Sequence, residues 1–370
     1  MSALASQVIA LLQERIRRMG FTPAVHFELE GCYVPGAAPT DLDFEAINRE
    51  LARFGIAGRL VREYWRHQWE YVSDFAGQTP LQEARNLAFV MAHLPRIMAR
   101  QGVAEVLIRP VVWSGDQGKL APGSKTLFAG EVRAVHIPNA IQLNVSVTDA
   151  EGENLVAEGA FGEYLQQCFL RTSLPCSLLF LPEEEAFERL RLKTLYGLDD
   201  ELCSPVDISG GHQGSVALYR ELGKHNQRMG EETLLYAHDH SALLTTQNWR
   251  KTARVEHRLG ASSLRYDPFV NIIFALLNIV DALDAHVAGC CIPSSPAPRA
   301  LPASLEDRGG VHGAISLFER DEWFASSIDR VAAEWNQHNN TAALAVDDGI
   351  GHQLKEQVLK CYRKDIMTTP

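Results

Sequence analysis

The segment Arg254–Arg258 has residue types and a spacing that suit the binding of a phosphate group. On a β-strand alternate side chains share a face, so Arg254, Glu256 and Arg258 would project together. A carboxylate in such a group can ligate a metal ion, and guanidinium groups bind phosphoryl oxygens. Taken alone, the pattern also fits a solvated strand face or a structural ion pair. It therefore predicts a phosphate site only if other parts of the chain supply matching groups.

Further oxygen donors lie on segments in which polar and apolar residues alternate. These donors are Glu28, Glu30, Glu63, Glu70, Gln142, Asn144 and Glu256. On a strand, the carboxylates of Glu28 and Glu30 would lie about 7 Å apart on one face. Two like charges that close need a cation nearby, or one of them is protonated. Hard oxygen ligands suit Mg²⁺ or Mn²⁺ rather than zinc, although each glutamate taken singly also fits a solvated strand face.

Strands and helices alternate along the chain and would position these donors. Strand patterns cover residues 24–34, 59–72 (with a turn), 105–113, 140–148 and 252–259, and helical patterns cover 4–19, 45–54, 81–101, 268–283, 321–337 and 351–364. Pro95 should kink its helix, and Asp267 should cap the helix that begins at Pro268. The strands have one polar and one apolar face, which favours an antiparallel sheet wrapped by helices over a parallel doubly wound sheet. The sequence thus predicts an α+β fold.

The composition is that of an ordinary globular protein. The chain has 370 residues, enough for one large domain or two smaller ones. Its net charge of −11 argues against a general nucleic-acid binder, and it has no run of 18 apolar residues that would indicate a membrane span. The seven cysteines include no C-x-x-C pair, which indicates reduced thiols in a cytoplasmic protein.

Six segments carry these and related motifs in a fixed order. They cover residues 26–30, 62–70, 79–102, 139–155, 254–269 and 301–306. In that order they resemble the catalytic domain of glutamine synthetase and its relatives in the glutamate–amine ligase superfamily. The Glu28-x-Glu30 pair resembles the family's Glu-x-Glu, residues 254–258 its Arg-x-Glu-x-Arg strand, and residues 301–305 its Leu-Pro-x-x-Leu segment. The resemblance is colinear almost end to end and is weakest over residues 156–225.

The resemblance implies both a fold and a reaction. The fold would be a curved antiparallel β-sheet, or partial barrel, wrapped by helices. It would form a single domain over residues 1–370, with a C-terminal helical part from about residue 303. In the reaction, a substrate carboxylate would attack the γ-phosphate of ATP, and an amine would then displace phosphate from the acyl phosphate to form a γ-glutamyl-type amide. Positioning and charge neutralisation dominate such chemistry.

The resemblance also implies roles for individual residues. Two divalent ions, Mg²⁺ or Mn²⁺, would be held by two sets of side chains: Glu30, Glu63 and Glu70 near the amine and acyl phosphate, and Glu28, Gln142 and Glu256 at the nucleotide phosphates. Arg254 and Arg258 would stabilise the transferring phosphoryl group and bind the acid. Glu63 would complete the catalytic set, and Arg228 would be the arginine of a substrate flap that also contacts the nucleotide.

The chain departs from the family pattern in three places. The resemblance begins where the family's catalytic domain begins, without the N-terminal β-grasp domain that completes a neighbouring subunit's site. The family's His-x-His is replaced by Gln142-x-Asn144, which is similar to a Gln-x-Asn in plant-type glutamate–cysteine ligases. His240 stands where the family has an arginine. We therefore expect an amine other than ammonia and no ring assembly of the usual kind, while a homo-oligomer stays open.

Two other functions are compatible with the sequence. One is phosphotransfer to a guanidino or carboxylate acceptor on the same fold. The other is a catalytically inactive regulatory or scaffold protein, which the altered histidines favour and the five carboxylates oppose. Of the three functions, we predict the ligase. It would be a cytoplasmic enzyme that joins an amino-acid-like carboxylate to a small amine, with neither nucleic acid nor membrane as a partner.

Overall fold

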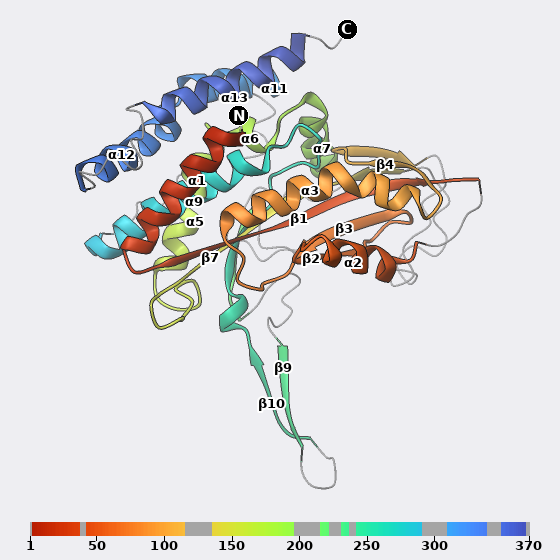
Figure 1. Ribbon diagram of the computed structural model, residues 1–370, viewed down its shortest axis with the longest axis horizontal. Coiled ribbons are helices and arrows are strands. Elements are labelled where there is room, and N and C mark those ends of the chain that lie inside the picture. The colour runs from red at the N-terminus through yellow and green to blue at the C-terminus, as the bar shows by residue number, and fades with distance from the viewer. Residues whose placement is uncertain are drawn as a thin grey trace.

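An antiparallel sheet of seven strands is the largest sheet in the part of the chain that the structure describes (Figure 1). The computed structural model describes residues 2–37, 42–114, 135–195, 215–221, 231–236, 242–290, 309–338 and 349–367. The main path of the sheet runs in the order β2 (Gly58–Arg62), β3 (Gln68–Ser73), β1 (Thr22–Pro35), β7 (Ile141–Thr148), β11 (Arg254–His257) and β8 (Val216–Tyr219). Strand β4 (Val103–Leu107) pairs with the far end of β1. The sheet is open, as β2 and β8 form its two edges.

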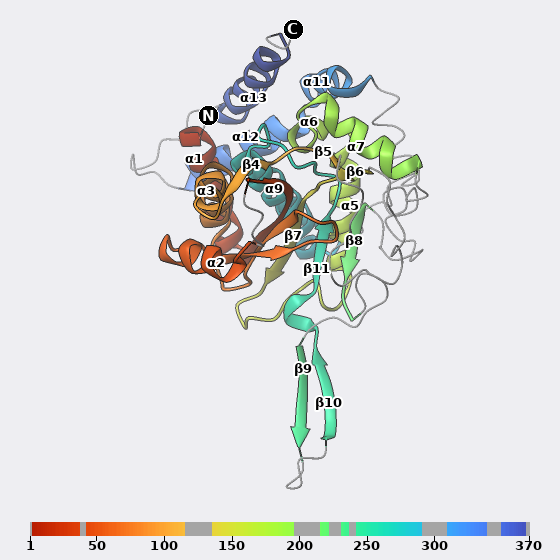
Figure 2. The ribbon, with the colours of Figure 1, turned by 90° about the vertical axis from the view of Figure 1, so that its right-hand side faces the viewer.

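Two further pairs of strands lie outside this sheet. Strands β5 (Val111–Ser114) and β6 (Val135–Pro138) form one pair, and β9 (Glu231–Tyr236) and β10 (Ala242–Asn248) form the other. The β9–β10 pair projects away from the rest of the chain in both views (Figures 1 and 2). A 3₁₀ turn at Arg250–Thr252 connects β10 to β11.

Helices cover one face of the sheet. The helices are α1 (Ser2–Arg18), α2 (Phe44–Arg53), α3 (Pro80–Ala99), α5 (Phe161–Ser173), α6 (Ser177–Phe180), α7 (Glu184–Leu195), α9 (Pro268–Ala288), α11 (Gly310–Arg320), α12 (Trp323–His338) and α13 (Ile350–Met367). Helices α1, α3 and α9 pack on β1, and α5 packs on β8 and β11. The side chains that face these helices, such as Phe27, Leu29 and Val145, are fully buried. The other face of the same strands carries the polar residues.

Helix α9 is the central helix of the core. Asp267 caps it by accepting hydrogen bonds from the backbone N–H groups of Phe269 and Val270, and Pro268 stands at its first turn. By length and composition this helix could cross a membrane, yet 78% of its most apolar window is buried inside the fold. The apolar residues of α9 are therefore part of the buried core.

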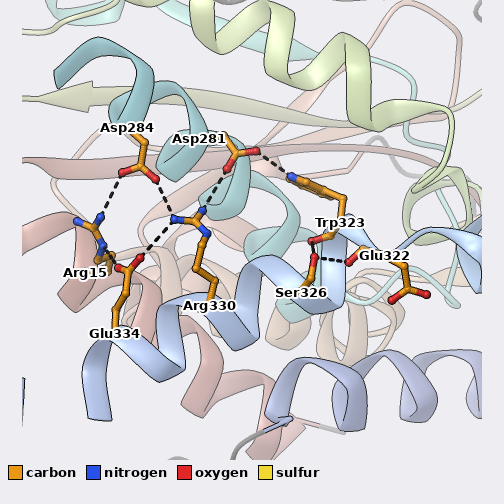
Figure 3. A network of polar contacts seen from close by, with 8 residues as sticks. All are labelled: Arg15, Asp281, Asp284, Glu322, Trp323, Ser326, Arg330 and Glu334. Atoms are coloured by element: carbon orange, nitrogen blue, oxygen red, sulfur yellow. Dashed lines mark hydrogen bonds and ion pairs between the residues drawn. The ribbon is translucent and has the colours of Figure 1, made fainter. Parts of the chain in front are cut away.

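A network of charged residues attaches α12 to α1 and α9 (Figure 3). Arg15 on α1 contacts Asp284 at 3.2 Å and Glu334 at 2.9 Å. Arg330 on α12 contacts Asp284 at 3.1 Å and Asp281 at 3.4 Å. The indole N–H of Trp323 donates to Asp281 at 2.8 Å. Because half-exposed ion pairs contribute little, the Trp323–Asp281 hydrogen bond should be the strongest member.

Replacement of Asp281 by alanine is expected to lower the free energy of unfolding by about 2 kcal/mol, because it leaves the Trp323 N–H without an acceptor. Replacement by asparagine should cost less than half as much, because the amide oxygen can still accept from Trp323. Urea unfolding of the two variants measures the difference. Equal losses in both would show that charge, and not the indole hydrogen bond, holds α12.

Most of the predicted elements are confirmed. The alternation over residues 24–34 and 140–148 corresponds to β1 and β7, and the fold is α+β with antiparallel pairing, as expected. The single strand expected over residues 105–113 is wrong. The chain there forms β4 and β5, which belong to different sheets, and Pro110 between them has no amide hydrogen for a continuous ladder. Helix α3 continues past Pro95, and α11 was not predicted.

Candidate active site

The sheet register brings the predicted site residues of β1, β7 and β11 onto one face. Glu28 lies opposite Gln142, and Asn144 lies opposite both His26 and Glu256. Residues paired directly across antiparallel strands point to the same side. This side is opposite to the one covered by α9, so three segments far apart in sequence meet at one polar patch.

Three side chains of this patch, Glu28, Gln142 and Glu256, form what we call the amide–carboxylate cluster. One atom of the Gln142 amide lies 2.7 Å from Glu256 Oε1 and 3.3 Å from Glu28 Oε2. If that atom is the amide nitrogen, it donates a hydrogen bond to each carboxylate. If it is the amide oxygen, three oxygens face one another, and a cation is needed between them. A glutamine can rotate from the first state to the second, so the cluster fits a hard divalent ion such as Mg²⁺ or Mn²⁺.

Glutamine is what completes this cluster. Over the described residues, no group of three or more His, Cys, Asp and Glu side chains lies close enough to hold a metal ion. The cluster contains only two such groups, and the third donor is the amide of Gln142. The amide of Gln142 therefore supplies the third donor, and the donor set consists entirely of oxygen atoms.

Two arginines flank Glu256. Arg254 Nη2 donates to Glu256 Oε2 at 3.1 Å, and Arg258 Nε lies 3.4 Å from Glu256 Oε1. Arg254 Nε also donates to Asn144 Oδ1, while Asn144 Nδ2 donates to Glu28 Oε1 at 3.0 Å. Asn144 thus connects the guanidinium to the second carboxylate, and the whole patch is one hydrogen-bonded network.

Arg258 is the least satisfied member of this network. Its residue is 5% exposed, and its Nη1 makes no hydrogen bond to any described residue. A buried guanidinium N–H without an acceptor is costly and calls for an explanation, and a ligand that supplies the acceptor is one such explanation. A phosphoryl or carboxylate oxygen has the right charge and geometry.

Two aromatic residues beside Arg254 were not predicted. Tyr219 lies opposite Arg254 in the register, and its ring centroid is 5.1 Å from the Arg254 guanidinium. The buried hydroxyl of Tyr219 has no hydrogen-bond partner among the described residues. Burial, assisted by the charge of Glu256, raises the pKa of Tyr219, so the hydroxyl is a neutral donor. Phe75 is 49% exposed, and its ring lies 6.0 Å from the same guanidinium.

A second group, the carboxylate row, consists of Glu30, Glu63 and Glu70. Glu30 lies directly opposite Glu70. The Glu63 N–H donates to the Gln68 carbonyl at 3.3 Å, which extends the ladder and puts Glu63 on the same face. Glu30 Oε2 accepts from the Ala140 N–H at 2.8 Å. The three share a face without forming a three-carboxylate group around one point in the described structure, so their role as ligands of one ion stays a prediction.

Solved structures with the same fold include glutamine-synthetase-type proteins. The chain is similar to a protein described as a novel glutamine synthase homologue (TM-score 0.57, 17% identity, 95% of this chain and 74% of that one). It is also similar to GmaS without ligand (0.54, 13%, 97% and 74%) and to a GmaS/ADP complex (0.58, 13%, 97% and 74%). No protein-family model and no curated protein sequence matches the chain.

The chain has a glutamine-synthetase-like fold. At 13–17% identity the likeness establishes the fold alone. The glutamine-synthetase-like fold accounts for the colinear order of the motifs, because the strands that carry them occupy neighbouring places in one sheet. Of the predicted site residues, eight lie on the polar face, while Arg228 and the segment 301–306 lie outside the described residues.

Proposed function

We propose that this protein is an ATP- and divalent-metal-dependent ligase that joins a carboxylate to an amine. The glutamine-synthetase-like fold supports a ligase, and the GmaS/ADP complex is a protein of this fold with a bound nucleotide. The observation that carries the proposal is the unsatisfied Nη1 of buried Arg258, beside a carboxylate flanked by two arginines. That arrangement of guanidinium groups suits the binding of an anionic oxygen.

Each part of the polar face would do a different part of the work. The amide–carboxylate cluster would hold the divalent ion, which when bound offsets negative charge on phosphoryl oxygens. Arg258 would donate from Nη1 to the transferring phosphoryl group, and Arg254 would donate to a neighbouring oxygen. Phe75, exposed beside Arg254, would stack on the nucleotide base, since every base offers a π-face.

The reaction would proceed in two steps. An oxygen of the substrate carboxylate forms a bond to the γ-phosphorus as the bond to the bridging oxygen breaks, and ADP leaves. The amine nitrogen then bonds to the acyl carbon, the bond from that carbon to the phosphate oxygen breaks, and phosphate leaves. A proton of the amine passes to the carboxylate row, where we assign Glu63 as acceptor. We further propose an amino-acid-like acid and a small amine other than ammonia as substrates.

Calorimetric titration with ATP, with and without Mg²⁺ or Mn²⁺, followed by a phosphate-release screen of acids and amines, tests the proposal. A ligase should bind ATP at least tenfold more tightly with metal than without it, and it should release phosphate only when both an acid and an amine are present. A phosphorylated acid or guanidine without an amide would indicate a phosphotransferase instead. Absence of nucleotide binding with either metal would reject the proposal and favour a non-catalytic protein.

A further inference from the structure

Tyr219 lies on the polar face of the sheet, at the edge that β8 forms. The register places it directly opposite Arg254 of β11, and paired residues of antiparallel strands point to the same side. Its ring centroid lies 5.1 Å from the Arg254 guanidinium, and the residue is 1% exposed. The edge strand therefore adds a buried phenol to the arginines and carboxylates of the candidate active site.

The hydroxyl of Tyr219 is directed across the polar face and not past the edge of the sheet. Burial raises the pKa of Tyr219, and charged groups of the polar face also act on it, namely Glu256, Arg258, Arg254 and Glu28. Glu28 lies on β1, and the strands β7 and β11 stand between β1 and β8. At the usual strand spacing the two backbones are about 14 Å apart. Because the charge of so distant a strand acts on the hydroxyl, the phenol extends toward the amide–carboxylate cluster.

This hydroxyl makes no hydrogen bond to any residue that the structure describes. A buried polar group normally has a partner in the fold or in a bound molecule. Nη1 of Arg258, on the same face, also makes no hydrogen bond to a described residue. One neutral and one charged donor thus lie on this face without acceptors, and an anion with several oxygens would supply acceptors to both.

We propose that Tyr219 binds ATP, and that its hydroxyl donates a hydrogen bond to an oxygen of the terminal phosphoryl group. A phosphoryl group has three acceptor oxygens, which match the three donors Arg254, Arg258 and Tyr219, whereas a carboxylate has only two. The phenol supplies its hydrogen bond without adding charge to a face that already holds two arginines and two carboxylates. This inference rests on the proposed ligase function and identifies a further residue of its nucleotide site.

The replacement Tyr219→Phe tests the assignment, because it removes the hydroxyl alone and keeps the ring beside Arg254. Calorimetric titration should show that Mg-ATP binds about ten- to hundredfold more weakly, as expected for the loss of a hydrogen bond to a charged group. Binding of Mg-ADP should be unchanged, because ADP lacks the terminal phosphoryl group. Urea unfolding without ligand should show the variant to be at least as stable as the native protein, because the lost hydroxyl has no partner among the described residues.

Tyr71→Phe is the matched control. Tyr71 is a buried tyrosine of the same sheet, but it lies opposite Leu29 on the face that the helices cover. Loss of its hydroxyl should leave the affinities for Mg-ATP and Mg-ADP unchanged.

Three results for Tyr219→Phe would overturn the inference: native affinity for Mg-ATP, an equal loss of affinity for Mg-ATP and Mg-ADP, or a ligand-free protein that is less stable than the native one. The second result would assign the hydroxyl to a part that both nucleotides share, and the third would show that it has a structural partner. Failure of the ligase proposal gives a different result, since the native protein itself would then not bind Mg-ATP, and the role of Tyr219 would be rejected with it.

Discussion

Replacement of Glu256 by glutamine is expected to reduce ATP-dependent phosphate release about 100- to 1,000-fold, the usual effect of removing one preorganised electrostatic group from an active site. Glu256 is 4% exposed, contacts both Arg254 and Arg258, and faces the Gln142 amide. Its loss would remove one of the two charged donors of the amide–carboxylate cluster. It would also leave two guanidinium groups without their shared counter-ion.

The metal dependence of binding gives a second readout for this variant. In the native protein, Glu28 and Glu256 should repel free ATP, so metal-free ATP should bind at least tenfold more weakly than Mg-ATP, by analogy with typical couplings between charged ligands. In Glu256→Gln the arginines would attract the phosphates without that repulsion. The difference in affinity between Mg-ATP and metal-free ATP should therefore disappear.

Calorimetric titration with Mg-ATP and with ATP plus a chelator measures this difference in affinity. Glu105→Gln is the matched control, because Glu105 is an exposed carboxylate on β4 of the same sheet. If Glu256→Gln retains both turnover and metal dependence, Glu256 is only a structural partner of the arginines, and the amide–carboxylate cluster is not the metal site.

The sequence predicts this site well where the alternation of residues is regular. Glu28 and Glu30 could be placed on one face because Phe27 and Leu29 between them are apolar. The polar and apolar faces of the strands also predicted the antiparallel sheet. Alternation within a strand says which side chains share a face, but it does not say which strands are neighbours.

The remaining parts of the site depend on pairing between distant segments. Asn144 connects Glu28 to Arg254 only because β7 lies between β1 and β11. Tyr219 was missed because its strand β8 is four residues long and lies in a segment without a clear pattern. Phe75 follows Glu70 by five residues, and a lone aromatic residue in a loop carries no signal until the fold brings it beside an arginine.

A buried carboxyl behind the site should control how stability depends on pH. Glu83 on α3 is fully buried, and its Oε2 accepts from the Ser73 hydroxyl at 2.6 Å. Its other oxygen lies 4.0 Å from His26 Nδ1 on β1. Burial raises the pKa of Glu83 from 4.5 to about 7, and hydrogen bonds from Ser73, Asn86 and Gln78 only partly oppose it.

The direction of the effect follows from this shift. Since its pKa is higher in the folded protein than in the unfolded chain, Glu83 stabilises the fold below about pH 4.5, and that contribution is lost as the pH rises through 7. The shift corresponds to about 3 kcal/mol. His26 has the opposite effect, because burial and the charge of Arg254 lower its pKa from 6.5 to about 4. Its contribution is lost as the pH falls through that range.

Glu83→Gln separates the two groups, because glutamine is neutral, similar in shape and able to accept from Ser73. At pH 4.5 the variant should be about as stable as the native protein, and at pH 8 it should be more stable by about 3 kcal/mol. Urea unfolding at the two pH values measures this difference. Glu356→Gln, on the exposed surface of α13, should show no such change. If Glu83→Gln and the native protein are equally stable at both pH values, the pKa of Glu83 is not raised by folding. Glu83 would then be ionised and would form an ion pair with His26, which lies 4.0 Å away.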